Sequence, residues 1–371
     1  MGGRQGPVEG LAVTPGYWKG RRVFVTGHTG FKGAWLAHWL ARMGAEVTGY
    51  AREAETEPSL WTLLGGGKVR SVIGDLTDEK RLRAALDESR PHAIFHLAAQ
   101  ALVRRSYRDP VETYASNVLG TVTLMQAARD CADLAAIVIA TSDKAYENVE
   151  QVWGYREVDA LGGRDPYSGS KGAADIAASS MARSFFAPLA EGGHKARVGI
   201  ARAGNVIGGG DWSEDRLVPD IVRGCLGPSR GVTLRAPKSV RPWQHVLEPL
   251  RGYLMLAERL AGDDKAAGAW NFGPDRRDER AVIEVAEAVV AALGQGRVEI
   301  DPAGDGTLHE AKMLRLDCTK ARLGLGWQPA LAFEDCVRLT AGWYAGWASG
   351  KTARSLCDQQ IVEYEGLVFN E

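Results

Sequence analysis

The stretch that decides the fold is RVFVTGHTGFKGAWLAHWLARMG, residues 22–44. It begins with a short apolar run rich in β-branched residues (23–26), which predicts a strand. Three glycines follow at every third position: Gly27, Gly30 and Gly33. Residues 34–44 then have apolar side chains at helical spacing. A strand that passes through a glycine turn into a helix is a common binding site for nucleotide pyrophosphates, because backbone N–H groups and the helix dipole point at the ligand.

The glycine spacing alone is weak evidence for a ligand site. With 45 glycines in 371 residues, a G-x-x-G-x-x-G pattern arises about once by chance, and a plain tight turn is the alternative interpretation. The position of the pattern, between the first predicted strand and the first predicted helix, favours dinucleotide binding over that alternative.

Composition favours a soluble enzyme of two domains, because 371 residues exceed the usual size of one small domain. The net charge of −1 argues against a nucleic-acid-binding protein, which usually has an excess of basic residues. No apolar run approaches the roughly 18 residues that span a membrane, and the N-terminal MGGRQGPVEG has no hydrophobic signal region. The five cysteines are scattered and never spaced as C-x-x-C, so we expect reduced thiols in the cytoplasm and no metal site.

Short apolar runs and amphipathic segments alternate from Arg21 onward. After the first strand and helix, the pattern predicts strands at 45–51, 68–76, 92–99, 135–142 and 196–208, and helices at 79–89, 111–131 and 168–186. Strands separated by helices need crossover connections, which produce a parallel sheet with helices on both faces. The sequence therefore predicts an α/β fold with a doubly wound parallel sheet, the Rossmann fold of dinucleotide-binding proteins.

The alternation ends near Asn205, where loop-like sequence rich in Gly, Pro and charge begins. Helical patterns return at 246–260, 280–293 and 333–348, and WNFGP at 270–274 predicts one more strand. We therefore expect three parts: a poorly ordered N-terminal extension at 1–19, a cofactor-binding domain at 20–204 with about 246–275, and a smaller C-terminal substrate-binding domain at 205–245 with 276–371.

Tyr167 and Lys171 stand four residues apart in DPYSGSK, at the start of the helix after the fifth strand. This spacing places both side chains on one helix face, beside the carboxyl ends of the strands. A cation next to a phenol stabilises the phenolate, so Lys171 would lower the pKa of Tyr167 toward that of a useful general base. The alternative is a tyrosine packed on the sheet and a solvated lysine.

ATSDKAYEN, residues 140–148, follows the fifth strand directly and brings Ser142, Asp143 and Lys144 to the same edge of the sheet. In isolation an Asp–Lys pair is more often a turn with a surface ion pair. Beside Tyr167 and a dinucleotide, the pair supplies an acid and a base within one site.

The type of dinucleotide stays open at this level. NAD-binding proteins usually have Asp or Glu at the end of the second strand to bind the ribose 2′-hydroxyl, whereas here Arg52 occupies that region. The two alternatives for Arg52 are contact with the 2′-phosphate of NADP and exposure to solvent. Asp75, at the end of the third strand, is a candidate for contact with the adenine, with capping of the next turn as its alternative.

Six segments together resemble the extended short-chain dehydrogenase/reductases, over about residues 20 to 350. The segments are TGHTGFKG, HLAAQ (96–100), SDK, YSGSK, ARAGNVIGGGDW and RPWQHV. Within that superfamily the chain is similar to the nucleotide-sugar 4,6-dehydratases, and in particular to their CDP-glucose branch. Most relatives that dehydrate dTDP-sugars have Thr-Asp-Glu after the fifth strand, whereas this chain and the CDP-glucose branch have Ser-Asp-Lys. Ala145 departs from the bulkier residue that is common in that branch.

The resemblance implies a hydro-lyase that uses NAD to convert CDP-D-glucose to CDP-4-keto-6-deoxy-D-glucose. Tyr167, assisted by Lys171, takes the proton from the hydroxyl on sugar carbon 4 while hydride passes to NAD, and Ser142 hydrogen-bonds the same oxygen. Neutral Lys144 then removes the proton on carbon 5. Protonated Asp143 donates to the hydroxyl that leaves carbon 6, and the hydride returns to carbon 6. These roles require a raised pKa for Asp143 and a lowered pKa for Lys144.

The resemblance also implies which residues bind the ligands. It places His28 and Lys32 as a cationic pair beside the cofactor pyrophosphate, and the remaining cofactor contacts are Gly27, Gly30, Phe31, Gly33, Arg52, Asp75, Leu76, Ala98, Ala99, Tyr167 and Lys171. The implied substrate contacts are Gln100, Asn205, Arg216, Arg241 and His245. Of these, Asn205 and the two arginines contact the diphosphate. For His245, Trp212 and Trp243 the nucleoside pocket and the core are equal alternatives, and Asn117 is expected to be structural.

Alternatives to this function remain open. The base is assigned only by resemblance, so GDP-, dTDP- and UDP-linked hexoses are alternative substrates. Sugar 4-epimerases of the superfamily have small residues in place of Asp143 and its neighbour, which argues against that activity. A regulatory protein that senses the dinucleotide without turnover would not need the four catalytic side chains. Members usually dimerise through the long helices after strands four and five, so we expect a homodimer without nucleic-acid or membrane partners.

Overall fold

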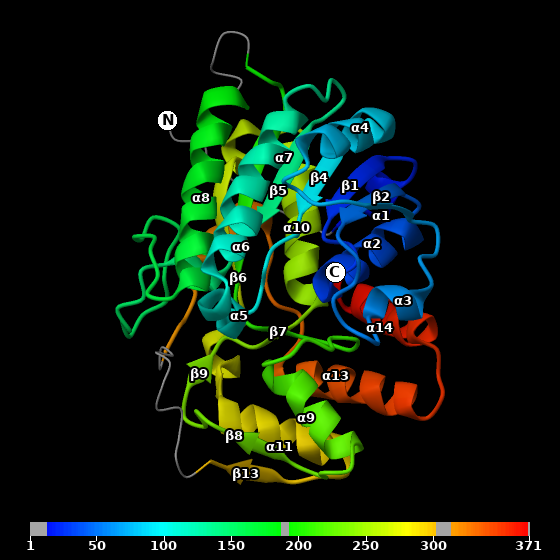
Figure 1. Cartoon of the computed structure of the whole chain (residues 1–371), viewed down its shortest axis with the longest axis vertical. Coiled ribbons are helices and arrows are strands. Elements are labelled where there is room, and N and C mark those ends of the chain that lie inside the picture. The colour runs from blue at the N-terminus through cyan, green and yellow to red at the C-terminus, as the bar shows by residue number, and fades with distance from the viewer. Residues whose placement is uncertain (1–12, 187–192, 302–312, 370–371) are drawn as a thin grey trace, which may run out of the picture.

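The computed structural model describes residues 13–186, 193–301 and 313–369. Its centre is a seven-stranded parallel sheet with the order β11-β6-β5-β4-β1-β2-β3 (Figure 1). The strands are β1 (Arg22–Thr26), β2 (Glu46–Ala51), β3 (Arg70–Ile73), β4 (Ala93–His96), β5 (Ala136–Ala140), β6 (Arg197–Ala203) and β11 (Gly268–Phe272). The order 3-2-1-4-5-6 is that of a doubly wound dinucleotide-binding sheet, so the predicted fold class is confirmed, and β11 is the additional strand.

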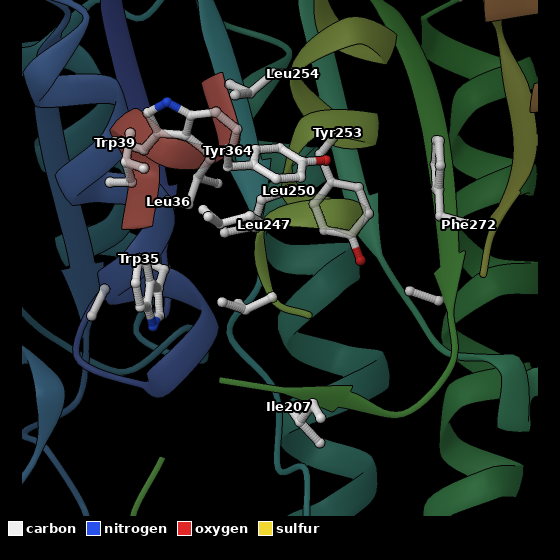
Figure 2. Close-up of a cluster of buried hydrophobic side chains, with 14 of the residues drawn as sticks. Trp35, Leu36, Trp39, Ile207, Leu247, Leu250, Tyr253, Leu254, Phe272 and Tyr364 are labelled. Carbon is white, nitrogen blue, oxygen red and sulfur yellow. The ribbon is translucent and has the colours of Figure 1, made fainter. Parts of the chain in front are cut away.

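Helices cover both faces of the sheet. Alternate strand residues point to opposite sides, and because both sets are apolar, each face needs a layer of helices. Val23 and Val25 share a core with α2 (Phe31–Arg42), α10 (Leu247–Leu260) and α14 (Ala353–Val368). Figure 2 shows this core, in which the tryptophans of α2 lie beside the leucines of α10. Phe24, between the two valines, faces the other core with α4 (Glu79–Ser89), α7 (Gly120–Ala128) and α8 (Pro166–Phe185). Each face of the sheet is therefore buried.

The long helix predicted at 111–131 is interrupted. It is divided into α6 (Pro110–Tyr114), a π-helical turn (Ala115–Leu119) and α7. Within the π-turn the amide of Asn117 donates to Gln100 O at 3.0 Å and to Ser170 Oγ at 2.8 Å, and its Oδ1 accepts from Gln100 N at 2.8 Å. Asn117 thus joins the loop after β4 to α8, and its expected structural role is confirmed.

The chain beyond β6 contributes a second region, which lies below the sheet in Figure 1. It contains α9 (Leu217–Leu226), α11 (Val282–Leu293) and α13 (Phe333–Ala348), beside the parallel pair of β8 (Val232–Leu234) and β13 (Val298–Ile300). Two further strand pairs are β7 (Val206–Ile207) with β10 (Gln244–His245) and β9 (Val240–Arg241) with β12 (Arg280–Ala281). The remaining helices are short: α3 (Leu60–Leu64), α5 (Val103–Arg108), α12 (Thr319–Leu325), and 3-10 turns at Asp143–Ala145 (η2), Asp264–Ala266 and Arg276–Asp278. The helices expected at 246–260, 280–293 and 333–348 are present.

The N-terminal segment corrects one expectation. Residues 1–12 of the predicted extension lie outside the described residues, but Pro15–Trp18 form a helical turn, α1. Trp18 is fully buried, and its indole N–H donates to Glu258 Oε1 at 2.8 Å. Because burial of an indole with a satisfied N–H is strongly favourable, the prediction of poor order is wrong for residues 13–19. No helix in the described ranges has the length and apolar character needed to cross a membrane.

Candidate active site

The glycine loop is shaped by close backbone contacts. Gly27 has φ +78°, and a Cβ there would lie 2.7 Å from Ala98 N. A Cβ on Gly33 would lie 2.1 Å from Gly27 O, whereas one on Gly30 would come no closer than 3.4 Å to that oxygen. Gly27 and Gly33 are therefore required for the loop to close onto the start of α2, and Gly30, at the N-cap of α2, leaves open space above the helix terminus.

A cavity of about 1050 Å³ lies along the carboxyl ends of the strands and extends toward α9 and β8. This is where ligands bind in doubly wound folds. Most of the predicted site residues line it: Gly27, Gly30, Phe31, Lys32, Gly33, Arg52, Asp75, Leu76, Ala98, Ala99, Ser142, Asp143, Lys144, Tyr167, Lys171, Asn205, Arg216 and Arg241. The structure thus brings residues far apart in sequence to one site.

The segment after β5 forms a tight 3-10 turn, η2, which we call the catalytic turn (residues 142–145). Ser142 caps it: its Oγ accepts from Lys144 N at 3.1 Å and donates to Asp143 Oδ1 at 2.9 Å. Asp143 Oδ1 also accepts from Lys144 N at 2.8 Å. The Nζ of Lys144 lies 5.9 Å from the ring centre of Tyr167. These contacts place a carboxyl group, an amine and a phenol close together in the cavity.

Asp143 has the environment of a protonated carboxyl group. Burial raises its pKa, although Lys144 and the hydrogen bond with Ser142 oppose that rise. Its Oδ2 is buried and has no hydrogen-bond partner among the described residues. A neutral carboxyl group has an O–H that can donate to a departing oxygen. The expected direction of the pKa shift of Asp143 is therefore confirmed.

Tyr167 and Lys171 lie together on α8 and are both nearly fully buried. Burial raises the pKa of Tyr167, against the opposing effects of its hydrogen bond with Ser142 and of the Arg216 charge. Burial also lowers the pKa of Lys171 to about 8. The prediction of a lowered pKa for Tyr167 is wrong for this structure, because desolvation outweighs the Ser142 hydrogen bond and the Arg216 charge.

His28 and Lys32 do not form a cationic pair. His28 is fully buried, its Nε2 lies 2.7 Å from Ser71 Oγ, and its ring packs edge-on against Trp61. Burial lowers its pKa to about 4, so the imidazole is neutral at pH 7. Lys32 does line the cavity, where its Nζ donates to the hydroxyl of Tyr253 at 2.9 Å. Burial, followed by the charges of Lys171 and Arg216, lowers the pKa of Lys32 to about 7.

Two predicted substrate contacts do not line the cavity. Gln100 is buried, and its amide donates to Leu102 O and Thr113 Oγ1, which closes the loop after β4. His245 is fully buried at the end of β10, where its ring packs against Trp35 and burial lowers its pKa to about 3. The amide of Gln100 is thus satisfied inside the fold, and its contact with substrate stays a prediction. For His245 the burial agrees with the core alternative, and its Nε2 has no hydrogen-bond partner among the described residues.

The region after β2 and β3 contains Arg52 and Asp75, two of the predicted cofactor contacts, and both line the cavity. Arg52 and Arg105 each form ion pairs with both Glu55 and Glu112. The charge of Arg52 is thus already balanced, which argues against its use for a 2′-phosphate. Asp75 Oδ1 accepts from the backbone and hydroxyl of Thr77 at 2.9 and 2.7 Å, as its capping alternative predicts, and its contact with an adenine stays a prediction.

The other end of the cavity contains the predicted diphosphate residues. Arg241 is buried there, and its charge acts on Asp143. Arg216 pairs with Asp211 at 3.2 Å. Trp212 and Trp243 both line this end. Trp212 also packs on Tyr344 and Trp347, so it contacts both the cavity and the core.

Sequence reasoning missed Tyr253. Its side chain is fully buried on α10, more than 200 residues from Lys32 in the sequence, and its hydroxyl accepts a hydrogen bond from Lys32 Nζ. No local pattern in the sequence distinguishes this tyrosine from the apolar core residues that surround it in Figure 2. In the described ranges no group of three or more His, Cys, Asp or Glu side chains could hold a metal ion.

Comparison with known proteins identifies the family. The family model for GDP-mannose 4,6 dehydratase matches residues 24–340. A CDP-glucose 4,6-dehydratase of Salmonella typhimurium is 44% identical over 354 residues, which cover 95% of this chain and 98% of that protein. The structure of DesIV, a dTDP-glucose 4,6-dehydratase from Streptomyces venezuelae with NAD and TYD bound, is 25% identical with a TM-score of 0.72, covering 88% of this chain and 98% of that one.

An epimerase structure shows the same fold. UDP-glucose-4-epimerase from Stenotrophomonas maltophila has a TM-score of 0.77 at 21% identity and covers 89% of this chain and 100% of that one. At that identity the likeness concerns the fold alone. The family match and the 44% identity, by contrast, confirm the resemblance that the six motifs carry. The chain belongs to the GDP-mannose 4,6 dehydratase family.

Proposed function

We propose that the chain is an NAD-dependent hydro-lyase that converts CDP-glucose to CDP-4-keto-6-deoxyglucose. One observation supports this most directly: a buried carboxyl group with a raised pKa, Asp143, lies in the same cavity as Lys144 and the Tyr167–Lys171 pair. A simple dehydrogenase or epimerase needs Tyr167 and Lys171 but not the carboxyl group of Asp143. The 44% identity to a CDP-glucose 4,6-dehydratase supports the choice of base and sugar.

The residues at the amino end of α2 fit a dinucleotide. Side chains at Gly27 or Gly33 would collide with backbone atoms, so the loop keeps its N–H groups accessible to a pyrophosphate. The ion pairs of Arg52 favour NAD over NADP, since the guanidinium already has two carboxylate partners. When bound, NAD supplies the acceptor and donor of hydride.

Tyr167 and Lys171 serve the oxidation half of the reaction. The phenolate form of Tyr167 takes the proton of the carbon-4 hydroxyl, and Ser142, which hydrogen-bonds Tyr167, also holds that oxygen. Lys171, with a pKa of about 8, is mainly protonated at pH 7 and stabilises the phenolate that accepts this proton. A ligand that excludes water strengthens both interactions.

Asp143 and Lys144 serve the elimination half. The 4-keto group acidifies the proton on carbon 5, which Lys144 removes in its neutral form. Asp143 donates its proton to the hydroxyl that leaves carbon 6 as water. The two residues are adjacent in the catalytic turn, and one proton is taken as another is given. The neutral state of Lys144 stays a prediction.

Arg216, Arg241 and Asn205 are proposed to bind the nucleotide diphosphate. They line the end of the cavity that lies next to α9 and β9, and guanidinium groups bind phosphate oxygens in bidentate fashion. This supports the division into a cofactor part and a substrate part, with boundaries at about 204, 246 and 275, which stays a proposal.

The proposed reaction is tested by incubation with CDP-, dTDP-, GDP- and UDP-glucose under added NAD or NADP. We expect a 4-keto-6-deoxy sugar from CDP-glucose with NAD, and no net accumulation of NADH. Epimerised sugar, or NADH formed in proportion to substrate, would refute dehydration. Faster turnover of another nucleotide sugar would refute the base assignment.

The role of Lys144 has its own test. Lys144→Ala should still oxidise carbon 4, measured as enzyme-bound NADH, but should lose exchange of the carbon-5 proton with deuterated water. Lys144→Arg, which keeps a cation but not a usable base at pH 7, is the matched variant and should behave in the same way. Exchange at the unmodified rate in either variant would remove Lys144 from the base role.

We also propose a homodimer. Three apolar side chains are exposed on neighbouring elements: Val111 on α6 (79%), Leu119 in the π-turn (54%) and Ile176 on α8 (56%). These elements belong to the helices that follow β4 and β5, and an exposed apolar face of this kind favours self-association. Leu119→Glu with Ile176→Glu should convert the dimer to a monomer in analytical ultracentrifugation, whereas Val362→Glu, an exposed residue on α14, should not. A monomeric parent protein would refute the proposal.

A cytoplasmic location is proposed from the thiols. All five cysteines are buried and unpaired with one another, as is usual in a reducing compartment.

A further inference from the structure

A buried ion pair lies directly behind the catalytic turn. Arg202 of β6 donates from Nε and Nη2 to the two carboxylate oxygens of Asp175 on α8, each at 2.8 Å. Their side chains are 4% and 0% exposed. In the described ranges neither residue lines the cavity, so the pair has no direct access to substrate or cofactor.

The pair holds both ends of the catalytic turn. Thr141, immediately before the turn, donates from Oγ1 to Asp175 Oδ2 at 3.0 Å. Tyr146, immediately after it, accepts from Arg202 Nη1 at 2.9 Å, and the guanidinium lies 4.8 Å from the centre of its ring. One bidentate ion pair is thus the common anchor of the two residues that flank Ser142, Asp143, Lys144 and Ala145.

The same pair fixes the turn against the helix that carries the phenol. Tyr167, Lys171 and Asp175 follow one another at intervals of four, which places them on one face of α8. The turn packs directly on this helix, since a Cβ on Gly172 would lie 3.1 Å from Ala145 O. Asp175 therefore belongs to the catalytic helix and at the same time to the anchor of the catalytic turn.

Arg202 and Tyr146 also form hydrogen bonds with neighbouring segments. Its Nη1 donates to Glu157 O at 3.1 Å, and the Tyr146 hydroxyl donates to Asn271 Oδ1 at 2.7 Å. Asn271 stands opposite Arg202 in the sheet and donates to Tyr155 O at 2.8 Å. The network reaches the loop that connects the catalytic turn to α8, so a shift of Arg202 would be transmitted to both.

We propose that Arg202 and Asp175 are positioning residues that keep Asp143 and Lys144 in register with Tyr167 and Lys171. The oxidation and elimination halves of the reaction then act on one bound sugar without its movement between them. This inference rests on the proposed function. Displacement of a catalytic group by about 1 Å can cost on the order of 10²-fold in rate. A rigid anchor of the catalytic turn would therefore directly affect the rate of the elimination half.

The test separates the two halves in Asp175→Asn, Arg202→Lys and Thr141→Val. Asn keeps an oxygen for Thr141 but loses the charge, and Lys cannot form the bidentate contact. We expect formation of the 4-keto-6-deoxy product to fall by about 10- to 100-fold in the first two and less in Thr141→Val. The KM for CDP-glucose should stay within about threefold, because the binding residues are not displaced. Enzyme-bound NADH should accumulate in a single turnover, and carbon-5 exchange should fall with product formation.

Loss of one partner of a buried pair destabilises a protein, so folding needs its own control. The double variant Asp175→Leu with Arg202→Met removes both charges and should recover stability, but it should still accumulate NADH. Glu248→Gln removes a buried carboxylate on the far side of α10, where it accepts from Ala330 N, Leu331 N and Tyr364. It should lower the melting temperature without any accumulation of NADH.

The outcomes distinguish the two proposals. If the unmodified enzyme forms no 4-keto-6-deoxy sugar, the proposed function fails whatever the variants do. If the unmodified enzyme dehydrates CDP-glucose and the folded double variant does so at the parent rate, the pair has no positioning role. Equal loss of NADH formation and of elimination in all folded variants would also overturn the proposal, because it would show a general structural effect.

Discussion

The glycine loop and the catalytic turn both follow central strands at the same edge of the sheet, yet they are built in opposite ways. The loop after β1 takes its shape from missing side chains, since Gly27 and Gly33 allow backbone to meet backbone. The turn after β5 takes its shape from polar side chains, which bind to each other and to a buried ion pair. Steric requirements leave a short local pattern in the sequence. A polar anchor that comes from two other elements does not.

The largest expected effect concerns the turn. Asp143→Asn should lower dehydration by about 10²- to 10⁴-fold while NADH formation continues. Burial raises the pKa of Asp143, so the acid is protonated above the usual carboxyl range and dehydration should fall as pH rises through that raised pKa. The residual activity of Asp143→Asn should lack this alkaline limb in a pH–rate profile.

Asp143→Asn also tests, through the stability of the protein, whether the buried carboxyl group of the turn is charged. Asn keeps the oxygen that accepts from Lys144 N but removes a carboxyl group whose ionisation is disfavoured by burial. We therefore expect the melting temperature at pH 8 to stay the same or to rise. A clear fall would show that Asp143 is charged and structural, and would contradict its role as an acid.

The second effect concerns the loop. Gly33→Ala should destabilise the protein by about 3 kcal/mol, the upper part of the range for overpacking, because the new Cβ meets a carbonyl oxygen and no side chain can move aside. Gly30→Ala is the matched control in the same loop, with its nearest atom at 3.4 Å, and should change stability by less than about 1 kcal/mol. Urea unfolding of both variants measures the difference, and equal losses would contradict the steric explanation.

The third effect concerns His28, a buried ionisable residue of the loop. The pKa of His28 is lowered to about 4 from an ordinary value of 6.5, so the unfolded chain takes up this proton at a higher pH than the folded chain. The contribution of neutral His28 to the free energy of unfolding is present above pH 6.5 and is lost as pH falls toward 4. The loss is about 2 kcal/mol between pH 6.5 and 5. His28→Gln should remove this part of the pH dependence in denaturant titrations at pH 7 and pH 5. An unchanged pH dependence would mean that the imidazole is accessible and charged.

The smallest effect concerns a polar contact on the outside of the loop. Ser59 caps α3 through a capping box with Thr62, and α3 carries Trp61, which packs on His28. Ser59→Ala should cost about 1 kcal/mol, measured by thermal unfolding, with NAD affinity unchanged. A loss as large as that of Gly33→Ala would show that the loop depends on polar contacts as the turn does.

Much of the fold could be predicted from the sequence, because hydrophobic periodicity and glycine positions are local properties. The six alternating strands, α4 and the additional strand β11 were all expected. The π-turn was not, since it depends on the side-chain contacts of Asn117 with Gln100 and Ser170. The order of residues 13–19 was missed for a similar reason, because Trp18 is stabilised by Glu258, 240 positions away.

The candidate site was predicted unevenly. The residue types at the catalytic turn and at Tyr167 and Lys171 were sufficient to place them on one cavity, because the carboxyl ends of parallel strands meet there. Their charge states were not, since the pKa values of Tyr167, Lys32 and His28 depend on desolvation. Motif membership also could not separate Gln100 and His245, which are buried in the interior, from neighbours that line the cavity.

The position of β11 has a consequence for synthesis on the ribosome. β11 pairs with β6 at one edge of the sheet, although 64 residues separate the end of one strand from the start of the other. The backbone of β6 therefore has an unpaired edge until residues 268–272 have emerged from the exit tunnel. An open edge of this kind, in a chain that folds as it is made, is a site for pairing with other chains. Early binding of a chaperone to this nascent edge would protect the chain until β11 arrives.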